Sequence, residues 1–248
     1  MPHPLDGAFA RVDRASSHLE ELKSLIEVFR LEGENEFFRN RDPNPATAVY
    51  GFSMTSVERN IVSPAIPVPV GFPIVVGDVV HNLRAALDYL VFELAKRDSH
   101  GVAQDHTQFV IETRVEPNDK RTFATRNKRF LNGLSIPHIA ALEGMQPQNG
   151  GAWLKTLSDI SNQDKHREFI ATGGRWEGSL TQVQGPSGSF DGRPGKVFRG
   201  IGKNGADVYM EGKYTLDIQF PDGLSTVETL EMLRVKVRDT LEFFKPEL

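Results

Sequence analysis

The chain has 248 residues, which corresponds to one or two domains and is long enough to bury a core without a metal ion or a disulfide. Its composition, with 39% apolar and 25% charged residues, is that of a globular protein, and its net charge of −4 argues against a generally basic nucleic-acid-binding protein. The chain contains no Cys, which excludes disulfides, thiol nucleophiles and Cys-ligated zinc or iron–sulfur centres. Because the sequence shows neither a secretion signal nor an apolar run near the roughly 18 residues of a membrane helix, we expect a soluble, cytoplasmic protein.

The first part of the sequence passes from a helical to an extended pattern. Residues 7–32 place apolar side chains at helical spacing and predict an amphipathic helix, and the polar residues 33–46 predict a loop. Residues 47–58 alternate apolar with small or polar side chains, which predicts a half-buried strand. The prolines from Pro64 to Pro73 predict an extended connector, because proline disfavours both helix interiors and central strands.

Residues 74–97 carry the strongest helical pattern in the chain. Their valines and leucines form one apolar stripe, and the opposite side of the helix carries Asp78, His81, Arg84 and Asp88. An ordinary solvated face would use Glu and Lys, because Asp and His are less favourable inside a helix. We therefore interpret this face as one whose side chains have specific partners.

The rest of the chain mixes both kinds of pattern. Shorter helices are predicted at 119–131, 136–144 and 152–162, a β-meander over the Gly-rich stretch 168–220, and a final helix over 226–244 that follows a capping-box pattern. Because no composition break separates two cores, we predict a single α+β domain over residues 1–248. In this domain a helical bundle of about six helices packs with an antiparallel β-meander.

Two motifs with a functional appearance are interpreted as structural. Residues 200–205 match G-x-G-x-x-G, but the predicted next element is a strand and not the helix that a dinucleotide site requires, so a hairpin turn is favoured. Residues 120–130 interleave basic and aromatic side chains, and in an acidic chain we favour a solvated helix face. The sequence thus argues against a nucleotide cofactor and against nucleic acid as a partner.

A second concentration of polar side chains follows the predicted helix 152–162. This segment contains Asn162, Asp164, His166 and Arg167. A charged face on an apolar helix must find either water or complementary charge, because burying unpaired charge is costly. We therefore expect the 162–167 segment to lie within hydrogen-bonding reach of the 78–88 face.

Together the two segments resemble a widespread set of uncharacterised bacterial proteins, in which an HNLR-x-ALD helix and an N-x-DKHR segment recur. The corresponding stretches here are HNLRAALD at 81–88 and NQDKHR at 162–167, and QFVI at 108–111 and MQP at 145–147 also fit. The chain departs from the set at Tyr89, where His is expected, and at Val110, where Pro is expected. No activity is established for the set, so the resemblance supports the choice of residues and implies no reaction.

One interpretation of these residues is a hydrolase with a polar pocket between the two segments. His81 or His166 would act as general acid or base toward a water molecule, and Arg84 would stabilise a developing anion. The candidate catalytic residues are Asp78, His81, Arg84, Asp88, Asn162, Asp164, His166 and Arg167. A divalent metal held by both histidines and one carboxylate is the metal-assisted form, although the sequence contains no H-E-x-x-H pair.

Two other interpretations stay open. The chain weakly resembles the HEPN ribonuclease class, whose signature is Arg, four to six residues and then His, but neither Arg84 nor His166 has a partner at that spacing. Alternatively, the polar residues form a buried network that locks the fold of a non-enzymatic binding protein. The sequence identifies no small-molecule or protein partner, gives no reason to expect a membrane partner, and leaves self-association open.

Overall fold

The computed structural model describes residues 2–39, 61–62, 66–67, 69–116, 118–165, 173–178, 181–183, 198–201, 207–211, 215–220 and 223–248. The chain divides into two compact units. The first comprises Met1–Leu22, Val70–Ala171 and Val227–Leu248, and the second comprises Lys23–Pro69 and Thr172–Thr226. The single domain over residues 1–248 stays a prediction.

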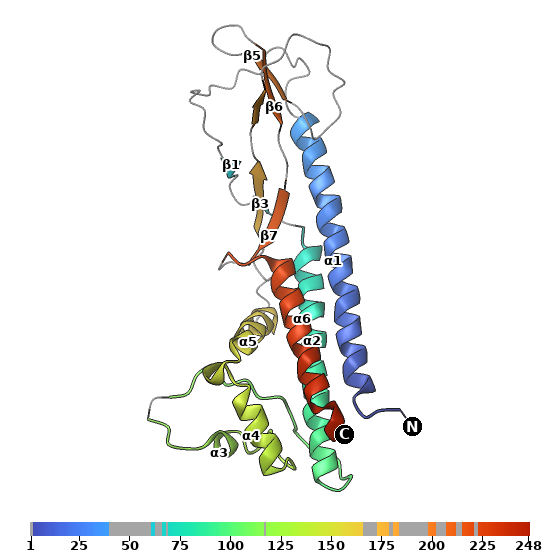
Figure 1. The fold of residues 1–248 in the computed structure, drawn as a ribbon, viewed down its shortest axis with the longest axis vertical. Coiled ribbons are helices and arrows are strands. Elements are labelled where there is room, and N and C mark those ends of the chain that lie inside the picture. The colour runs from blue at the N-terminus through green and yellow to red at the C-terminus, as the bar shows by residue number, and fades with distance from the viewer. Residues whose placement is uncertain are drawn as a thin grey trace. The chain divides into compact units, whose positions relative to one another are not determined.

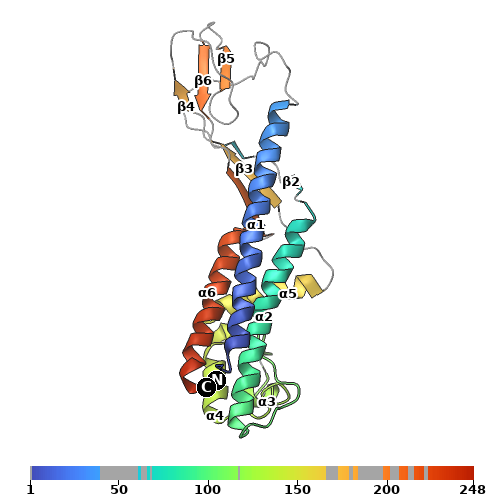
Figure 2. The same ribbon diagram turned by 90° about the vertical axis from the view of Figure 1, so that its right-hand side faces the viewer.

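The first unit is built from helices. The N-terminal half of α1 (Asp6–Arg39) is followed by α2 (Gly71–Asp98), α3 (Phe123–Arg126), α4 (Ile136–Gly144), α5 (Ala152–Lys165) and α6 (Thr226–Phe244), with the 3-10 helices η1 (Pro147–Asn149) and η2 (Lys245–Glu247). Figures 1 and 2 show α2 and α6 alongside this half of α1 and running in the opposite direction. The shorter α5 packs against α2.

The core of this unit lies between the long helices, because each presents an apolar stripe. From Leu5, which directly precedes α1, the buried residues follow alternating spacings of three and four: Leu5, Ala8, Val12, Ala15, Leu19 and Leu22. The predicted stripes on α2 and α6 are confirmed, since all but two of their large apolar members are buried. The exceptions lie in the first turns of the two helices: Ile74 of α2 is 56% exposed, and Val227 of α6 is half-buried.

The helix bounds differ from the predicted ones where local signals are weak. α4 and α6 begin and end where predicted, whereas α1 continues through the predicted loop to Arg39 and α3 covers only four residues of the predicted helix 119–131. The extended connector was predicted to reach Pro73, but this residue lies in the first turn of α2. Proline is tolerated there because the first N–H groups of a helix have no partner within it.

The second unit contains short strands in two sheets. In one sheet β3 (Gly173–Gly178) pairs antiparallel with β1 (Ile61–Val62), β2 (Ile66–Pro67) and β7 (Thr215–Gln219), with Trp176 opposite Leu216. In the other, β6 (Asp207–Glu211) lies between β4 (Thr181–Val183) and β5 (Phe198–Ile201), and Ile201 is opposite Asp207. The element after residues 200–205 is therefore a strand, as expected, and residues 202–206 lie outside the described part.

The predicted α+β architecture is wrong: the protein is mainly helical, and its described residues form six α-helices. No strand occurs among the described residues of the first unit, whose helices pack on one another. Residues 206–220, predicted as one strand of a meander, contribute β6 and β7 to two different sheets. Alternation of side chains predicts extended backbone but not the strand with which it pairs. The predicted strand 47–58 and the first residues of the predicted β-meander, 168–172, lie outside the described residues.

Candidate functional site

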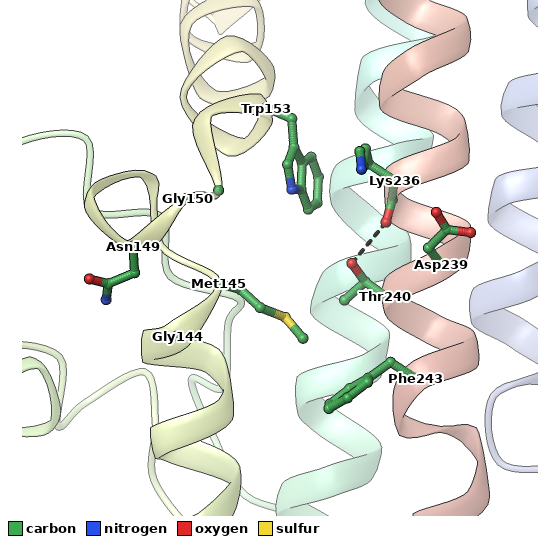
Figure 3. A pocket seen from close by; sticks show the side chains of 10 residues that line it. Gly144, Met145, Asn149, Gly150, Trp153, Lys236, Asp239, Thr240 and Phe243 are labelled. Carbon is green, nitrogen blue, oxygen red and sulfur yellow. Dashed lines mark hydrogen bonds between the residues drawn. The ribbon is translucent and has the colours of Figure 1, made fainter.

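A shallow hollow of about 350 Å³ lies between the turn that joins α4 to α5 and one side of α6 (Figure 3). Met145 and Trp153 line it from the α4–α5 side, and Lys236, Thr240 and Phe243 line it from α6. Five of the eight residues predicted as catalytic have described side chains (Asp78, His81, Arg84, Asp88 and Asn162), and none of these five lines this hollow. The predicted residues of α2 are therefore described separately from this hollow.

The predicted polar face of α2 divides into two parts. Asp78 and His81 are exposed to solvent, whereas Arg84 and Asp88, one and two turns further along, are half-buried. The four residues share one side of the helix as predicted, but only the second pair is covered by another part of the chain. The covering part is the segment around Phe109.

Arg84 and Asp88 hold the backbone of Phe109 from both sides. The Asp88 Oδ1 atom accepts the Phe109 N–H at 2.9 Å, and the Arg84 Nη2 atom donates to the Phe109 carbonyl at 3.2 Å. The Phe109 side chain itself is fully buried. We call this arrangement the Phe109 clamp. It gives both polar groups of one buried residue the partners that a neighbouring strand would otherwise supply.

The Phe109 clamp places a cation in a poorly solvated position. Desolvation lowers the pKa of Arg84, and the nearby Asp88 carboxylate opposes this effect by raising it. The Arg84 Nη1 atom is shielded from solvent and has no hydrogen-bond partner in the described part of the chain. Removing Asp88 would therefore leave a shielded positive charge without its compensating negative charge.

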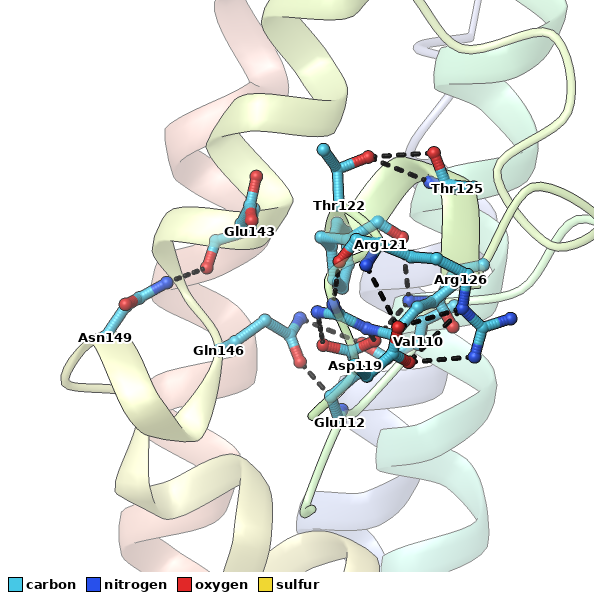
Figure 4. A network of polar contacts seen from close by, with 12 residues as sticks. Val110, Glu112, Asp119, Arg121, Thr122, Thr125, Arg126, Glu143, Gln146 and Asn149 are labelled. Atoms are coloured by element: carbon cyan, nitrogen blue, oxygen red, sulfur yellow. Dashed lines mark hydrogen bonds and ion pairs between the residues drawn. The ribbon is translucent and has the colours of Figure 1, made fainter. Parts of the chain in front are cut away.

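The side chain of Gln146 forms further hydrogen bonds with the segment that contains Phe109 (Figure 4). Its side chain is fully buried, and its Oε1 atom accepts the Glu112 N–H at 2.8 Å. Its Nε2 atom donates to the carbonyls of Val110 and Leu142, each at 3.0 Å. The Phe109 clamp and Gln146 together bond four backbone groups of this segment, which are the N–H and carbonyl of Phe109, the Val110 carbonyl and the Glu112 N–H. The side chains come from α2 and from the turn after α4.

Glu112 then ties this segment to the region of α3. Arg126 binds the Glu112 carboxylate with two hydrogen bonds of 2.8 Å, and the Asn127 amide donates to the same carboxylate. The hydrogen bond from Arg126 lowers the pKa of Glu112, against the opposing effect of desolvation. Arg126, predicted to lie on a solvated basic face, is instead part of a bidentate ion pair that is largely shielded from solvent.

A separate polar cluster joins α2, α4 and η2. The buried His138 ring has its Nδ1 atom 2.6 Å from Asp98 Oδ2 and its Nε2 atom 2.9 Å from Glu247 Oε2. Desolvation acts to raise the pKa of Asp98, but hydrogen bonds from the Ser135 N–H and from His138 outweigh it, so this pKa lies below its ordinary value. Sequence reasoning missed His138, because no spacing in the chain links it to Asp98 or Glu247.

The second predicted segment is only partly described. Asn162 is exposed, and its side chain bonds to Ser158 within α5. Asp164 belongs to α5, but its side chain lies outside the described part, as do His166 and Arg167 entirely. α5 packs against α2, so the two elements are neighbours. Contact between the 162–167 segment and the 78–88 face stays a prediction.

Three further observations concern metal binding, membrane-spanning helices and similarity to known proteins. Within the described residues, no group of three His, Asp or Glu side chains is arranged to hold a metal ion. No helix in the same part of the chain has both the length and the apolar character needed to cross a membrane. No family model, curated protein or solved structure matches the chain.

Proposed function

We propose that this chain is a non-catalytic protein that works by binding another protein chain, and that the polar residues of α2 stabilise its fold. The observation that carries this proposal is the Phe109 clamp, in which Arg84 and Asp88 are both occupied by one backbone segment. A binding role is supported by large apolar side chains that α6 exposes, among them Phe243 at 58%. Self-association is one form of such binding.

The clamp also suggests why the HNLR-x-ALD pattern recurs in the bacterial set that this chain resembles. Its Arg and Asp correspond to Arg84 and Asp88, and the QFVI and MQP stretches contain the backbone and the Gln146 side chain that complete the arrangement. In this proposal the shared residues specify one way of packing a segment on a helix. They need not perform a common reaction.

The hydrolase interpretation requires these residues to be available to a substrate. An Arg84 that stabilises an anion would have to leave the Phe109 carbonyl, and Asp88 would have to leave the Phe109 N–H. Asp78 and His81 are open to solvent, so a reaction that uses them together with His166 stays a prediction. The HEPN-like alternative still lacks the spacing between Arg and His that its signature requires.

Thermal and urea unfolding of four variants tests the proposal. Asp88→Ala and Arg84→Met should each lower the free energy of unfolding by about 2–4 kcal/mol, because each strands a backbone group of Phe109 and removes one member of a shielded charge pair. Asp78→Ala and His81→Ala are the controls on the exposed part of the same helix, and should stay within about 0.5 kcal/mol of wild type. Asp78→Ala also corrects for the higher helix propensity of Ala.

Arg84→Met and Asp88→Ala proteins as stable as the two controls would show that the covered residues do not support the fold. Such residues would be free for chemistry, as the hydrolase interpretation requires.

A further inference from the structure

The side of α6 that faces away from the core carries an uncovered apolar stripe. Met232, Val235 and Phe243 are 37%, 43% and 58% exposed. With 100° per residue, Met232 and Phe243 lie within about 20° of each other around the helix, and Lys236 and Asp239 fall between them on the same side. We call this surface, made of Met232, Val235, Lys236, Asp239 and Phe243, the α6 face.

The two charged residues of the α6 face have no partners in the described part of the chain. Neither Lys236 nor Asp239 forms an ion pair there, although other charged residues of the same helix do, such as Arg234 with Glu231 and Arg238 with Asp13. Both side chains are exposed beside the hollow that Trp153 lines (Figure 3). One positive and one negative group are thus presented one turn apart within an apolar stripe.

The order of these residues is self-complementary. When two copies of α6 are laid antiparallel with the two-fold axis midway between Lys236 and Asp239, each Lys236 is opposite the Asp239 of the other copy. The same register places each Met232 opposite the other copy's Phe243, because both pairs are centred on the same point of the helix. A two-fold contact requires one surface to complement itself. The Lys236–Asp239 pair meets that requirement in charge and the Met232–Phe243 pair in apolarity, whereas Val235 lies opposite Thr240.

We propose that two copies of this chain form a two-fold symmetric dimer through the α6 face. This inference names the partner for the proposed binding role and rests on that role. In the dimer, two symmetry-related ion pairs between Lys236 and Asp239 lie at the centre, and the Met232–Phe243 contacts flank them. The hollow lined by Met145 and Trp153 lies beside Phe243 and leaves room for the partner's Met232.

Sedimentation velocity of the full-length chain over a range of concentrations tests the proposal. Wild type should dimerise, and Lys236→Asp and Asp239→Lys should each weaken the dimer about tenfold or more, because each places like charges opposite each other twice. The two single variants mixed together should form a heterodimer, since every central contact then joins Lys to Asp. The double exchange, Lys236→Asp with Asp239→Lys, should also restore the dimer.

Matched controls show whether the changes act through this antiparallel register or through net charge and monomer stability. Lys128→Glu changes the net charge as much as Lys236→Asp does, at an exposed position far from α6 in the sequence, and should leave the dimer unchanged. Phe243→Ser should weaken the dimer and lower the melting temperature of the monomer only slightly, because this side chain is mostly exposed and packs with its edge against Phe244.

A wild-type chain that stays monomeric at all concentrations would overturn the inference, and so would a dimer that both single charge changes leave intact. A heterodimer that fails to form from the mixed variants would refute the antiparallel register. These outcomes are independent of the unfolding experiments on Arg84 and Asp88. A monomeric wild type therefore refutes the dimer while the non-catalytic proposal is judged by its own variants.

Discussion

Replacing Gln146 with Glu should destabilise the protein in a pH-dependent way. The amide of Gln146 donates to two carbonyls and accepts one N–H while fully buried. A carboxylate at this position still accepts the Glu112 N–H, but it faces the Val110 and Leu142 carbonyls with negative charge instead of a donor. Losing two hydrogen bonds at about 1 kcal/mol each and burying an unpaired charge should together cost about 3–5 kcal/mol at pH 8.

The sign of the pH dependence follows from the same contacts. Burial and the two carbonyls favour the neutral form of the introduced carboxyl group, so its pKa in the folded protein lies above that in the unfolded chain. Protonation then restores one donor, and the variant should regain about 1–2 kcal/mol or more relative to wild type below the unfolded pKa. That stability should be lost as the pH rises through the folded pKa.

Urea unfolding followed by circular dichroism at pH 5 and pH 8 measures this effect. Gln146→Leu is the control, because it removes the same hydrogen bonds without adding a titratable group, and its deficit of about 1–3 kcal/mol should not depend on the introduced charge. A Gln146→Glu protein as stable as wild type at pH 8 would refute the argument. Equal deficits for this variant at the two pH values would also refute it.

Three further predictions concern the described helical unit. Gly151→Ala should cost about 1–3 kcal/mol in a thermal melt, because the added Cβ atom would lie 1.7 Å from the Met145 carbonyl oxygen, and an unchanged midpoint would contradict this packing. His138→Leu should cost about 2–4 kcal/mol by leaving the Asp98 carboxylate without its ring partner, and a neutral effect in urea would refute a role for this cluster. The lowered pKa values of Asp98 and Glu112 contribute stability that is present above their ordinary values and is lost as pH falls through the folded values, so the free energy of unfolding should decrease below about pH 4.5, and less steeply in Glu112→Gln.

Local sequence patterns predicted the bounds of some helices correctly and those of others wrongly. α4 follows Ser135 and has Pro137 in its first turn, and α6 has a continuous apolar stripe, so both were predicted with the bounds that the structure has. In the predicted helix 119–131, Thr122 caps the start of α3, but only Phe123–Arg126 is helical. The overall class was predicted wrongly because strand-like alternation between residues 168 and 220 does not specify what those strands pack against.

The candidate site shows where sequence reasoning ends. Helical spacing alone placed Asp78, His81, Arg84 and Asp88 on one face, and the structure agrees. Which of them are covered depends on the segment around Phe109, which lies 21 residues beyond Asp88 and carries no helical pattern. Contacts between residues far apart in the sequence leave no local pattern. The polar residues of α2 were therefore equally compatible with a catalytic role and with a structural role.

Hydrogen exchange at the Phe109 amide tests the central claim most directly, because this N–H is the group that Asp88 accepts. In wild type the amide should exchange slowly. In Asp88→Ala it should exchange at least about tenfold faster, and by a larger factor than the amides in the middle of α6, whose rates rise only with the loss of global stability. The exposed variant Asp78→Ala should leave the Phe109 amide as protected as in wild type. If Phe109 exchanges at the same rate in wild type and in Asp88→Ala, then Asp88 does not hold this segment and the account of α2 as a structural element is contradicted.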